Sequence, residues 1–370
     1  MLLRHIRSYW FLTLLLALVV TVPPVAGACT GIRVKAKDGS VVFARTMEFG
    51  SCIKSDIMVV PRGQAWTALA PDGNKGMQWT GKYAYVGPNG FGLNCPIEGM
   101  NEKGLYAGAF WMPKGESVFP EVAPADYPKM LAQPDVANWL LGNCATVEEV
   151  RDAVLNKVKI GGVLVKTMGM YPYAHWYAMD TTGKAIVIES IHGKVTVTDN
   201  PVGVFTNAPS FSWHLRHLRT YGNLSPNNIE PYKLGDFTMR QFGEGSGMVG
   251  LPGDSTPPSR FVRAAFFANL ALTPADADGA VQVAMDLNDN FTIVKGMVRG
   301  KNADGSSEYD YTQWSTVYDM ARKAVYFRTY ENHNFRMVRF DKLPLTGKKV
   351  HIVPMWSVKP AYPDVSNTAK

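Results

Sequence analysis

Alternating apolar and polar residues near the N-terminus predict a β-hairpin. Residues Thr30–Lys35 and Ser40–Met47 are rich in β-branched and apolar side chains, and the Asp-Gly pair between them favours a tight turn. A second hairpin is predicted near the C-terminus, where two similar runs lie five residues apart. The strands expected after the first hairpin are Tyr83–Val86, Leu105–Met112, Trp176–Met179, Ala185–Ser190, Lys194–Thr198, Thr312–Asp319, Ala324–Thr329 and Phe335–Phe340.

Helical spacing of apolar residues appears mainly between these groups of strands. Thr146 and Glu149 form a capping box at the start of one such stretch. The expected helices are Thr146–Lys157, Trp213–Tyr221, Arg260–Leu272 and Pro274–Leu287. Strands at both ends with helices between them predict an α+β protein in which helices cover stacked sheets. Since no Pro- or Ser-rich linker divides the chain, we expect a single domain over residues 29–370.

The first 28 residues are typical of an export signal. Arg4 and Arg7 give a positive start, and Tyr9–Val20 is uncharged. The small residues 26–28 then form a pattern that signal peptidases accept. The apolar stretch is shorter than the roughly 20 residues of a membrane-spanning helix. We therefore expect a signal peptide over residues 1–28, a mature chain that begins with Cys29, and a periplasmic or secreted bacterial protein.

Two other interpretations of Cys29 stay open. A lipidated cysteine also follows a leader and small residues, although that pathway usually has a bulky aliphatic residue where this chain has Ala26. The protein would then be a lipid-anchored, non-catalytic binding protein, and only in that case would it associate with a membrane. Alternatively, Cys29 is an ordinary cysteine that happens to lie near a cleavage site.

Composition narrows the classes of function. The chain has 46% hydrophobic residues and can bury a large core. Its net charge of +7 is spread along the sequence, which argues against a nucleic-acid-binding surface. No CxxC motif or Cys/His cluster predicts a metal site. One disulfide at most can form among Cys52, Cys95 and Cys144 if Cys29 stays free.

An N-terminal cysteine could carry both a nucleophile and a base. Its α-amine would have an ordinary pKa of about 7.7–8.0, so it could accept the proton of its own thiol near neutral pH. Such a device works only after everything before Cys29 has been removed.

The segment that begins at Cys29 resembles the start of choloylglycine hydrolases and penicillin V acylases, which are N-terminal nucleophile (Ntn) hydrolases. The resemblance continues to the C-terminal hairpins, and the order and spacing of its motifs make it specific. The matching stretches are Cys29-Thr30-Gly31, Asp38-Gly39, Arg45-Thr46-Met47-Glu48, residues 101–105, residues 205–211, residues 251–261 and Thr312–Tyr330.

The resemblance implies roles for individual residues. Cys29 matches the nucleophile, and Arg45 matches an arginine beside it that favours the thiolate. Asn207 matches the asparagine that binds the oxyanion of the tetrahedral intermediate. Arg260 matches a second arginine close to the nucleophile.

Two positions depart from the most familiar pattern of the family. Glu48 stands where an aspartate usually positions the cysteine amine, and its extra methylene shifts the carboxylate by about a bond length. Trp111 stands where bile salt hydrolases have an asparagine and penicillin V acylases have an aromatic residue. An indole ring there would narrow and line an acyl pocket.

Taken one at a time, these residues have ordinary explanations. Arg45 and Glu48 could form a surface ion pair, and Asn207 before Ala-Pro could be a turn residue. Arg260 could be a solvated charge, and Trp111 could belong to the core. Only the joint match favours a catalytic site.

Histidines suggest two further sites, each of which departs from the expected sequence pattern. His214 and His217 lie three residues apart on a predicted helix but have no nearby third metal ligand. His175 with Cys95 or Cys144 could form a papain-like pair, although neither cysteine has the expected sequence context.

These observations predict a four-layer αββα sandwich of the Ntn type that hydrolyses a linear, non-peptide amide in a small molecule. No metal or organic cofactor is expected, and the resemblance implies homotetramers. Trp111 and the apparent export favour penicillin V or N-acyl homoserine lactones as substrates. Conjugated bile salts are the alternative.

Overall fold

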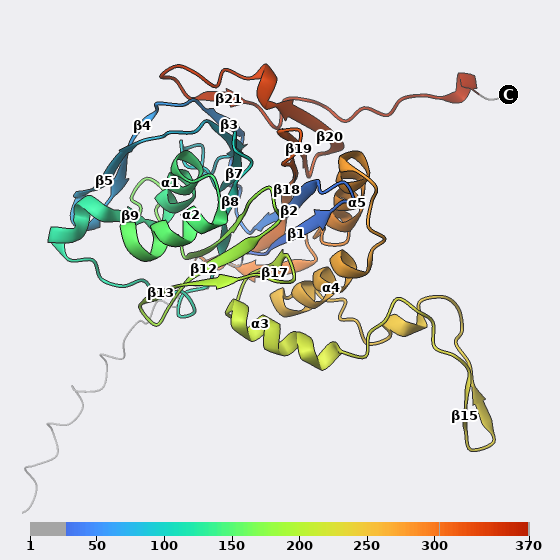
Figure 1. Ribbon diagram of the computed structural model, residues 1–370. Coiled ribbons are helices and arrows are strands. Elements are labelled where there is room, and N and C mark those ends of the chain that lie inside the picture. The colour runs from blue at the N-terminus through green and yellow to red at the C-terminus, as the bar shows by residue number, and fades with distance from the viewer. Residues whose placement is uncertain (1–26, 303, 369–370) are drawn as a thin grey trace, which may run out of the picture.

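Two β-sheets stacked face to face form the centre of the protein in the computed structural model, which describes residues 27–302 and 304–368 (Figure 1). The predicted signal peptide lies outside the described residues except for Gly27 and Ala28. The first sheet has the strand order β14-β1-β2-β18-β19-β20, with β17 paired to β18, and its pairs are antiparallel. Its strands are β1 (Cys29–Lys35), β2 (Val41–Phe49), β14 (Val204–Phe205), β17 (Val298–Lys301), β18 (Ser307–Asp319), β19 (Ala324–Thr329) and β20 (Asn332–Arg339).

The second sheet has the order β13-β12-β11-β8-β7-β6-β3-β21 and is also antiparallel. Its strands are β3 (Ile57–Val60), β6 (Tyr85–Pro88), β7 (Glu98–Asn101), β8 (Tyr106–Trp111), β11 (Ala174–Met179), β12 (Ala185–Ile191), β13 (Lys194–Asp199) and β21 (His351–Val353). Three two-stranded pairs lie outside both sheets: β4 (Ala65–Leu69) with β5 (Lys75–Thr80), β9 (Met130–Ala132) with β10 (Lys159–Gly161), and β15 (Tyr232–Leu234) with β16 (Phe237–Met239).

Helices cover the outer face of each sheet. On the first sheet lie α4 (Pro257–Leu270) and α5 (Ala277–Asp289), and α3 (Phe211–Leu218) packs against α4. On the second sheet lie α1 (Val136–Asn143) and α2 (Val147–Asp152). The predicted α+β class and αββα layering are therefore confirmed. None of the described helices is long and apolar enough to cross a membrane.

The hairpins predicted from alternation are present as β1–β2 and β18–β19. The Thr146 half of the capping box is present, since Glu149 N–H donates to Thr146 Oγ1 at 3.2 Å, whereas the Glu149 carboxylate accepts from Ala145 N–H at 2.7 Å. Helix α4 begins at Pro257, three residues before the predicted start, because proline is well suited to the first helical turn. The sequence patterns missed α1 and β3, which are short and apolar without clear periodicity, and β7, a four-residue strand of mixed polarity.

Aromatic side chains fill the space between the sheets. Phe43 of β2 stacks on Tyr177 of β11 with 4.8 Å between ring centroids, and Phe110 of β8 meets Phe205 of β14 at the same distance. All nine residues of β2 are buried, since its two faces pack against the second sheet and the helices. Polar residues on β2 are therefore enclosed, and they need partners within the protein.

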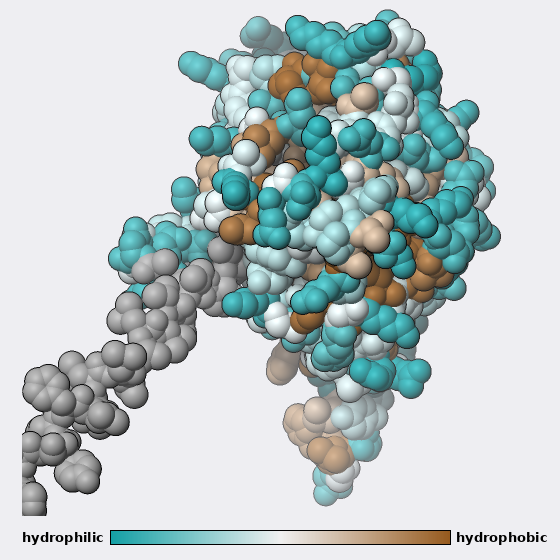
Figure 2. Space-filling model, turned by 90° about the vertical axis from the view of Figure 1, so that its left-hand side faces the viewer, coloured by the Kyte–Doolittle hydropathy of each residue, from teal (hydrophilic) through white to brown (hydrophobic). Residues whose placement is uncertain are grey.

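An arm of the chain projects from the body around β15 and β16 (Figure 1). Hydrophobic side chains are visible on this projection at the bottom of Figure 2. The exposed apolar residues of the arm are Ile229, Tyr232, Leu234, Phe237, Phe242 and Val249. A two-stranded ribbon has no core of its own, so these side chains stay in contact with solvent in a single chain.

Candidate active site

Cys29 is the first residue of β1 and lies between the two sheets, where only 1% of its surface is exposed. Its thiol donates to Met47 Sδ at 3.5 Å and accepts from Arg45 Nη2 at 3.3 Å. Burial raises the pKa of the Cys29 thiol above its ordinary value, while the Arg45 charge and hydrogen bond oppose that shift. The thiol is thus enclosed next to a cation that stabilises its ionised form.

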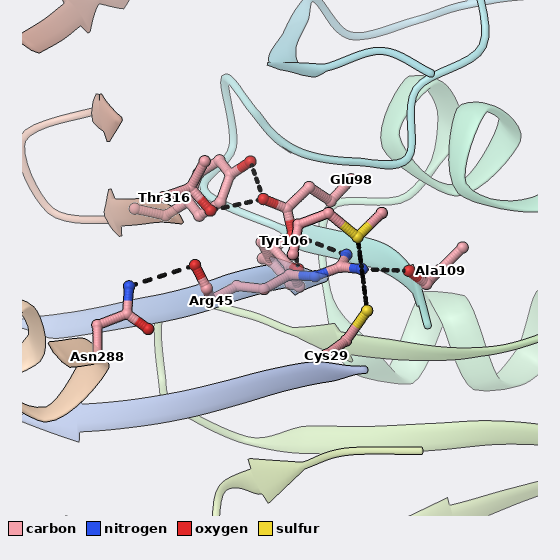
Figure 3. Close-up of polar contacts among 9 residues, drawn as sticks. Cys29, Arg45, Glu98, Tyr106, Ala109, Asn288 and Thr316 are labelled. Atoms are coloured by element: carbon pink, nitrogen blue, oxygen red, sulfur yellow. Dashed lines mark hydrogen bonds and ion pairs between the residues drawn. The ribbon is translucent and has the colours of Figure 1, made fainter. Parts of the chain in front are cut away.

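Arg45 reaches Cys29 from the neighbouring strand β2 and is completely buried (Figure 3). Its Nη1 donates to Glu98 Oε2 at 2.9 Å, and its Nη2 donates to the Ala109 carbonyl oxygen at 2.7 Å. The guanidinium carbon lies 4.0 Å from the centre of the Phe110 ring. Burial lowers the pKa of Arg45, but the carboxylate of Glu98 and the Cys29 thiol outweigh burial and raise it above its ordinary value. The suggested surface ion pair between Arg45 and Glu48 is wrong, because both side chains are buried.

Glu98 on β7 is the main counter-charge of Arg45 and was missed by the sequence analysis. Its carboxylate accepts hydrogen bonds from four side chains: Arg45 at 2.9 Å, Tyr106 at 2.5 Å, Thr316 at 2.6 Å and Tyr318 at 2.9 Å (Figure 3). A glutamate between the apolar residues of Pro96–Met100 was the available signal, because buried acids require partners. The partners themselves lie on other strands and could not be identified from local spacing.

Arg260 and Asn207 approach Cys29 from the other side. Arg260 on α4 donates through Nη1 to the Cys29 carbonyl oxygen at 2.5 Å and to Thr30 Oγ1 at 2.7 Å. Its Nη2 donates to Asn207 Oδ1 at 2.8 Å, and Cys29 N–H donates to the same oxygen at 2.7 Å. Asn207 Nδ2 donates to the Trp111 carbonyl oxygen at 2.8 Å. Two donors at Oδ1 and an acceptor at Nδ2 fix the orientation of this amide.

Glu48 lies on β2 opposite Thr312 of β18 and is also completely buried. Thr312 Oγ1 donates to Glu48 Oε1 at 2.6 Å, while Glu48 Oε2 has no partner among the described residues. Burial raises the pKa of Glu48 to about 7, against the opposing effects of Arg260 and Thr312. Asp310, two residues before Thr312 on the same face of β18, has its pKa raised to about 8 by burial and by Glu48.

Histidines take structural positions around this group. The ring of His214 on α3 is buried, and its Nε2 donates to the Asn207 carbonyl oxygen at 2.9 Å. Burial lowers the pKa of His214 to about 4. His217 stacks on Trp213 with 4.6 Å between ring centroids. His175 lies 3.1 Å from the Thr206 carbonyl oxygen, and its ring does not hydrogen-bond to a cysteine among the described residues.

The other three cysteines are also free thiols, and the described chain contains no disulfide among them. Cys52 is exposed. Burial raises the pKa of Cys95 to about 12, and burial likewise raises that of Cys144 to about 12. Neither of these two thiols lies beside an arginine as Cys29 does. Their ionised forms are therefore disfavoured, which weakens the papain-like interpretation.

A mainly apolar pocket opens at Cys29. Trp111, the last residue of β8, forms part of its wall and meets Phe49 and Tyr173 edge to face at 5.7 and 6.1 Å. A side chain at Gly27 would collide with the Trp111 ring, so the chain before Cys29 passes directly over this wall. The remaining lining side chains are mostly Met47, Ile53, Phe91, Pro96, Ile97, Phe110, Pro134, Met168, Met170 and Pro172.

Residues 29–353 match the family model described as linear amide C–N hydrolases, choloylglycine hydrolase family. The chain belongs to this family. A bile salt hydrolase/transferase from Clostridium perfringens is 33% identical over 328 residues, which is 87% of this chain and 95% of the relative. The family assignment also establishes the class of enzyme, a hydrolase of non-peptide C–N bonds in linear amides.

Solved structures of the family share the fold. The conjugated bile acid hydrolase from Clostridium perfringens has a TM-score of 0.80 at 29% identity, with 91% of this chain and all of the other covered. The penicillin V acylase from Agrobacterium tumefaciens has a TM-score of 0.71 at 26% identity, with 90% and 94% covered. The expected Ntn-hydrolase sandwich is therefore confirmed, and the relatives include a conjugated bile acid hydrolase and a penicillin V acylase.

Proposed function

We propose that the protein is an N-terminal cysteine amidohydrolase that removes an apolar acyl group from a small amide. The observation that carries this proposal is the position of Cys29 Sγ, 3.3 Å from Arg45 Nη2 at the mouth of the apolar pocket. Arg45 favours the thiolate, and the pocket is placed to receive the acyl group of a substrate whose carbonyl lies at Sγ.

The proposed reaction uses the freed α-amine of Cys29 as the base. The amine takes the thiol proton, the thiolate attacks the carbonyl carbon, and the resulting ammonium returns the proton to the leaving nitrogen. Water, deprotonated by the same amine, then cleaves the thioester and releases the acid. Asn207 Nδ2 carries two hydrogens and donates one to the Trp111 carbonyl oxygen, so the second can donate to the oxyanion.

Processing after Ala28 is part of this proposal, together with export by a signal peptide to the periplasm or the medium. While Ala28 is attached, Cys29 has an amide nitrogen, which is not a base. The Ala28 carbonyl oxygen accepts from Glu48 N–H at 2.8 Å, so the peptide bond to be removed lies beside Glu48. A protein that retains Ala28 should fold and stay inactive, whereas the same chain beginning at Cys29 should turn over. Equal kcat/KM for both, with intact masses verified, would rule out the amine mechanism.

The burial of Cys29 also bears on the lipid-anchor alternative. A diacylglyceryl group on this thiol would have to occupy the space between the sheets, beside the Arg45 guanidinium. Intact mass of the protein purified from bacterial membranes and from the soluble fraction distinguishes the two: a free Cys29 amine supports the hydrolase, and added lipid mass supports the anchor.

Penicillin V and N-acyl homoserine lactones are the substrates we favour. Besides Cys29, the polar side-chain groups lining the pocket are Cys95, Gln133, Tyr173 and the indole N–H of Trp111. Gln133 already uses its amide on the backbone of Val163. Hydroxyl groups of a bile acid would lose hydrogen bonds to water and find few replacements, whereas a phenoxyacetyl or aliphatic chain loses none of this kind.

Bile salts remain the competing substrates, because the relatives include a conjugated bile acid hydrolase. The test is kcat/KM for penicillin V, a long-chain acyl homoserine lactone and glycocholate, on the unmodified enzyme and on Trp111→Asn. We expect glycocholate to be the poorest substrate and Trp111→Asn to weaken the other two. Trp66→Asn is the matched control, because Trp66 packs on Trp79 in the β4–β5 hairpin away from the pocket. If the unmodified enzyme strongly prefers glycocholate, the substrates are bile salts and our assignment is wrong.

Assembly as a homotetramer is a further part of the proposal. The exposed apolar side chains of the arm would gain burial on another copy of the chain, which supports an oligomer. Analytical ultracentrifugation of the unmodified protein and of a Phe237→Ser, Phe242→Ser double variant tests it. A monomeric unmodified protein contradicts the tetramer.

A further inference from the structure

One wall of the apolar pocket is a loop, residues 162–173, that follows β10. Met168, Met170 and Pro172 of this loop line the pocket. The loop turns back on itself, with Val165 N–H donating to the Met170 carbonyl oxygen at 3.0 Å. How closely this wall approaches Cys29 depends on the contacts that hold the root of the loop, the first residues after β10, in place.

Gln133 holds that root. It directly follows β9, and its side chain is buried. Its Nε2 donates to the Val163 carbonyl oxygen at 2.9 Å, and its Oε1 accepts from Val163 N–H at 2.9 Å. The side-chain amide thus pairs with one residue of the loop in both directions, as one backbone pairs with another in a sheet.

This pairing lies just beyond the ladder between β9 and β10. The last backbone pair of that ladder joins Gly161 to Ala132. Gln133 follows Ala132 directly, and Val163 lies two residues after Gly161. Val163 is itself buried, so without Gln133 its N–H and C=O would be left unpaired away from water. The loop would then have to move outward to satisfy them.

We propose that Gln133 is a specificity-determining residue, whose amide fixes the Met168–Pro172 wall and so sets which acyl groups the pocket admits. Gln133 also lines the pocket itself, so the same side chain would border the acyl group and position the adjoining wall. The proposal rests on the proposed function, in which this pocket receives the acyl group.

The test compares Gln133→Met and Gln133→Glu with the unmodified enzyme. Methionine keeps the length of the side chain but makes neither hydrogen bond, and an ionised glutamate loses the donor to Val163. With the wall released, the ratio of kcat/KM for glycocholate to that for penicillin V should rise about tenfold, the scale on which a pocket discriminates one methylene group. The change should come mainly through KM, because Cys29 and its neighbours are untouched.

Asn101→Asp is the matched control. The Asn101 amide also joins backbone groups, donating to the Leu141 and Cys144 carbonyl oxygens at 2.9 and 2.7 Å, but it lies outside the pocket lining. A general loss of stability would appear in both variants, whereas a change in the substrate ratio should appear only at Gln133. Equal ratios in Gln133→Met, Gln133→Glu and the unmodified enzyme would overturn the proposal.

Hydrogen–deuterium exchange and product binding separate this proposal from the proposed function. Exchange in peptides covering residues 162–173 should increase in both Gln133 variants and not in Asn101→Asp. If the processed, unmodified protein cleaves none of the amides, the proposed function fails, and calorimetric binding of phenoxyacetate and cholate then tests the pocket alone. The role of Gln133 is contradicted if the Gln133 variants leave the ratio of cholate to phenoxyacetate binding unchanged. It is also contradicted if hydrogen–deuterium exchange in the loop is unaltered.

Discussion

Replacing Glu98 by glutamine should separate the stability of the protein from the reactivity of the Cys29 thiol. The carboxylate of Glu98 is completely buried and takes four donors, one of them the Arg45 guanidinium. Glutamine has nearly the same shape, but its NH₂ group can face only acceptors. In Glu98→Gln the NH₂ group therefore faces at least one donor that the carboxylate had accepted, and Arg45 loses its carboxylate partner.

The expected loss in the free energy of unfolding is about 3–5 kcal/mol, the usual cost of removing one member of a buried ion pair. Tyr318→Phe is the graded control: it deletes one hydroxyl donor, leaves the charge of Glu98 and its Arg45, Tyr106 and Thr316 contacts, and should cost about 1–2 kcal/mol. Urea denaturation followed by tryptophan fluorescence measures both. If Glu98→Gln costs no more than Tyr318→Phe, Arg45 does not depend on Glu98.

The reactivity of the Cys29 thiol should increase in Glu98→Gln, although the stability of the protein falls. Without the carboxylate, the Cys29 thiolate becomes the nearest anion to Arg45, at 3.3 Å, so the pKa of Cys29 should fall. The rate of alkylation by iodoacetamide, followed at the Cys29 peptide by mass spectrometry, should rise at a lower pH in Glu98→Gln than in the unmodified protein. A purely structural role for Glu98 predicts an unshifted pH midpoint.

Three further outcomes test the site. Cys29→Ser should keep the fold and lose nearly all hydrolysis, because a hydroxyl stays protonated where a thiol ionises; normal activity in Cys29→Ser would show that another residue is the nucleophile. In the chain that retains Ala28, the pKa values of Glu48 and Asp310 are raised from 4.5 to about 7 and from 3.8 to about 8. Protonation of these two carboxyls stabilises the folded state; it is complete below pH 4 and is lost by about pH 8. The melting temperature should therefore fall as the pH rises from 4 to 8, and it should fall less steeply in Asp310→Asn. His214→Leu removes the hydrogen bond to the Asn207 carbonyl oxygen, so it should lower kcat while changing KM less. An unchanged kcat would show that His214 does not position Asn207.

Local sequence patterns predicted the frame of the site better than its contacts. The β1–β2 hairpin follows from alternation and one Asp-Gly turn, and it places Arg45 and Glu48 on the strand beside Cys29. Asn207 and Arg260 contact Cys29 across 178 and 231 residues of sequence, and no periodicity encodes such distances. Those positions came from the resemblance to the family. Gln133 was missed because a buried amide that bonds to backbone leaves no pattern in the sequence.

The glutamate at position 48 can be understood from the same contacts. In the chain with Ala28 attached, Cys29 N–H already donates to Asn207 Oδ1, and Glu48 N–H holds the Ala28 carbonyl oxygen. Processing, as we propose it, would remove that carbonyl and add N–H donors to the Cys29 nitrogen. Glu48 Oε2 is a buried carboxylate oxygen that has no donor among the described residues, as is Oδ1 of the neighbouring Asp310, while Thr312 donates to Glu48 Oε1. In our proposal Glu48, held by the Thr312 hydroxyl on β18, accepts from the new amine at the position where the resemblance to the family implies an aspartate. Glu48→Asp should then lower activity by weakening the contact with Thr312.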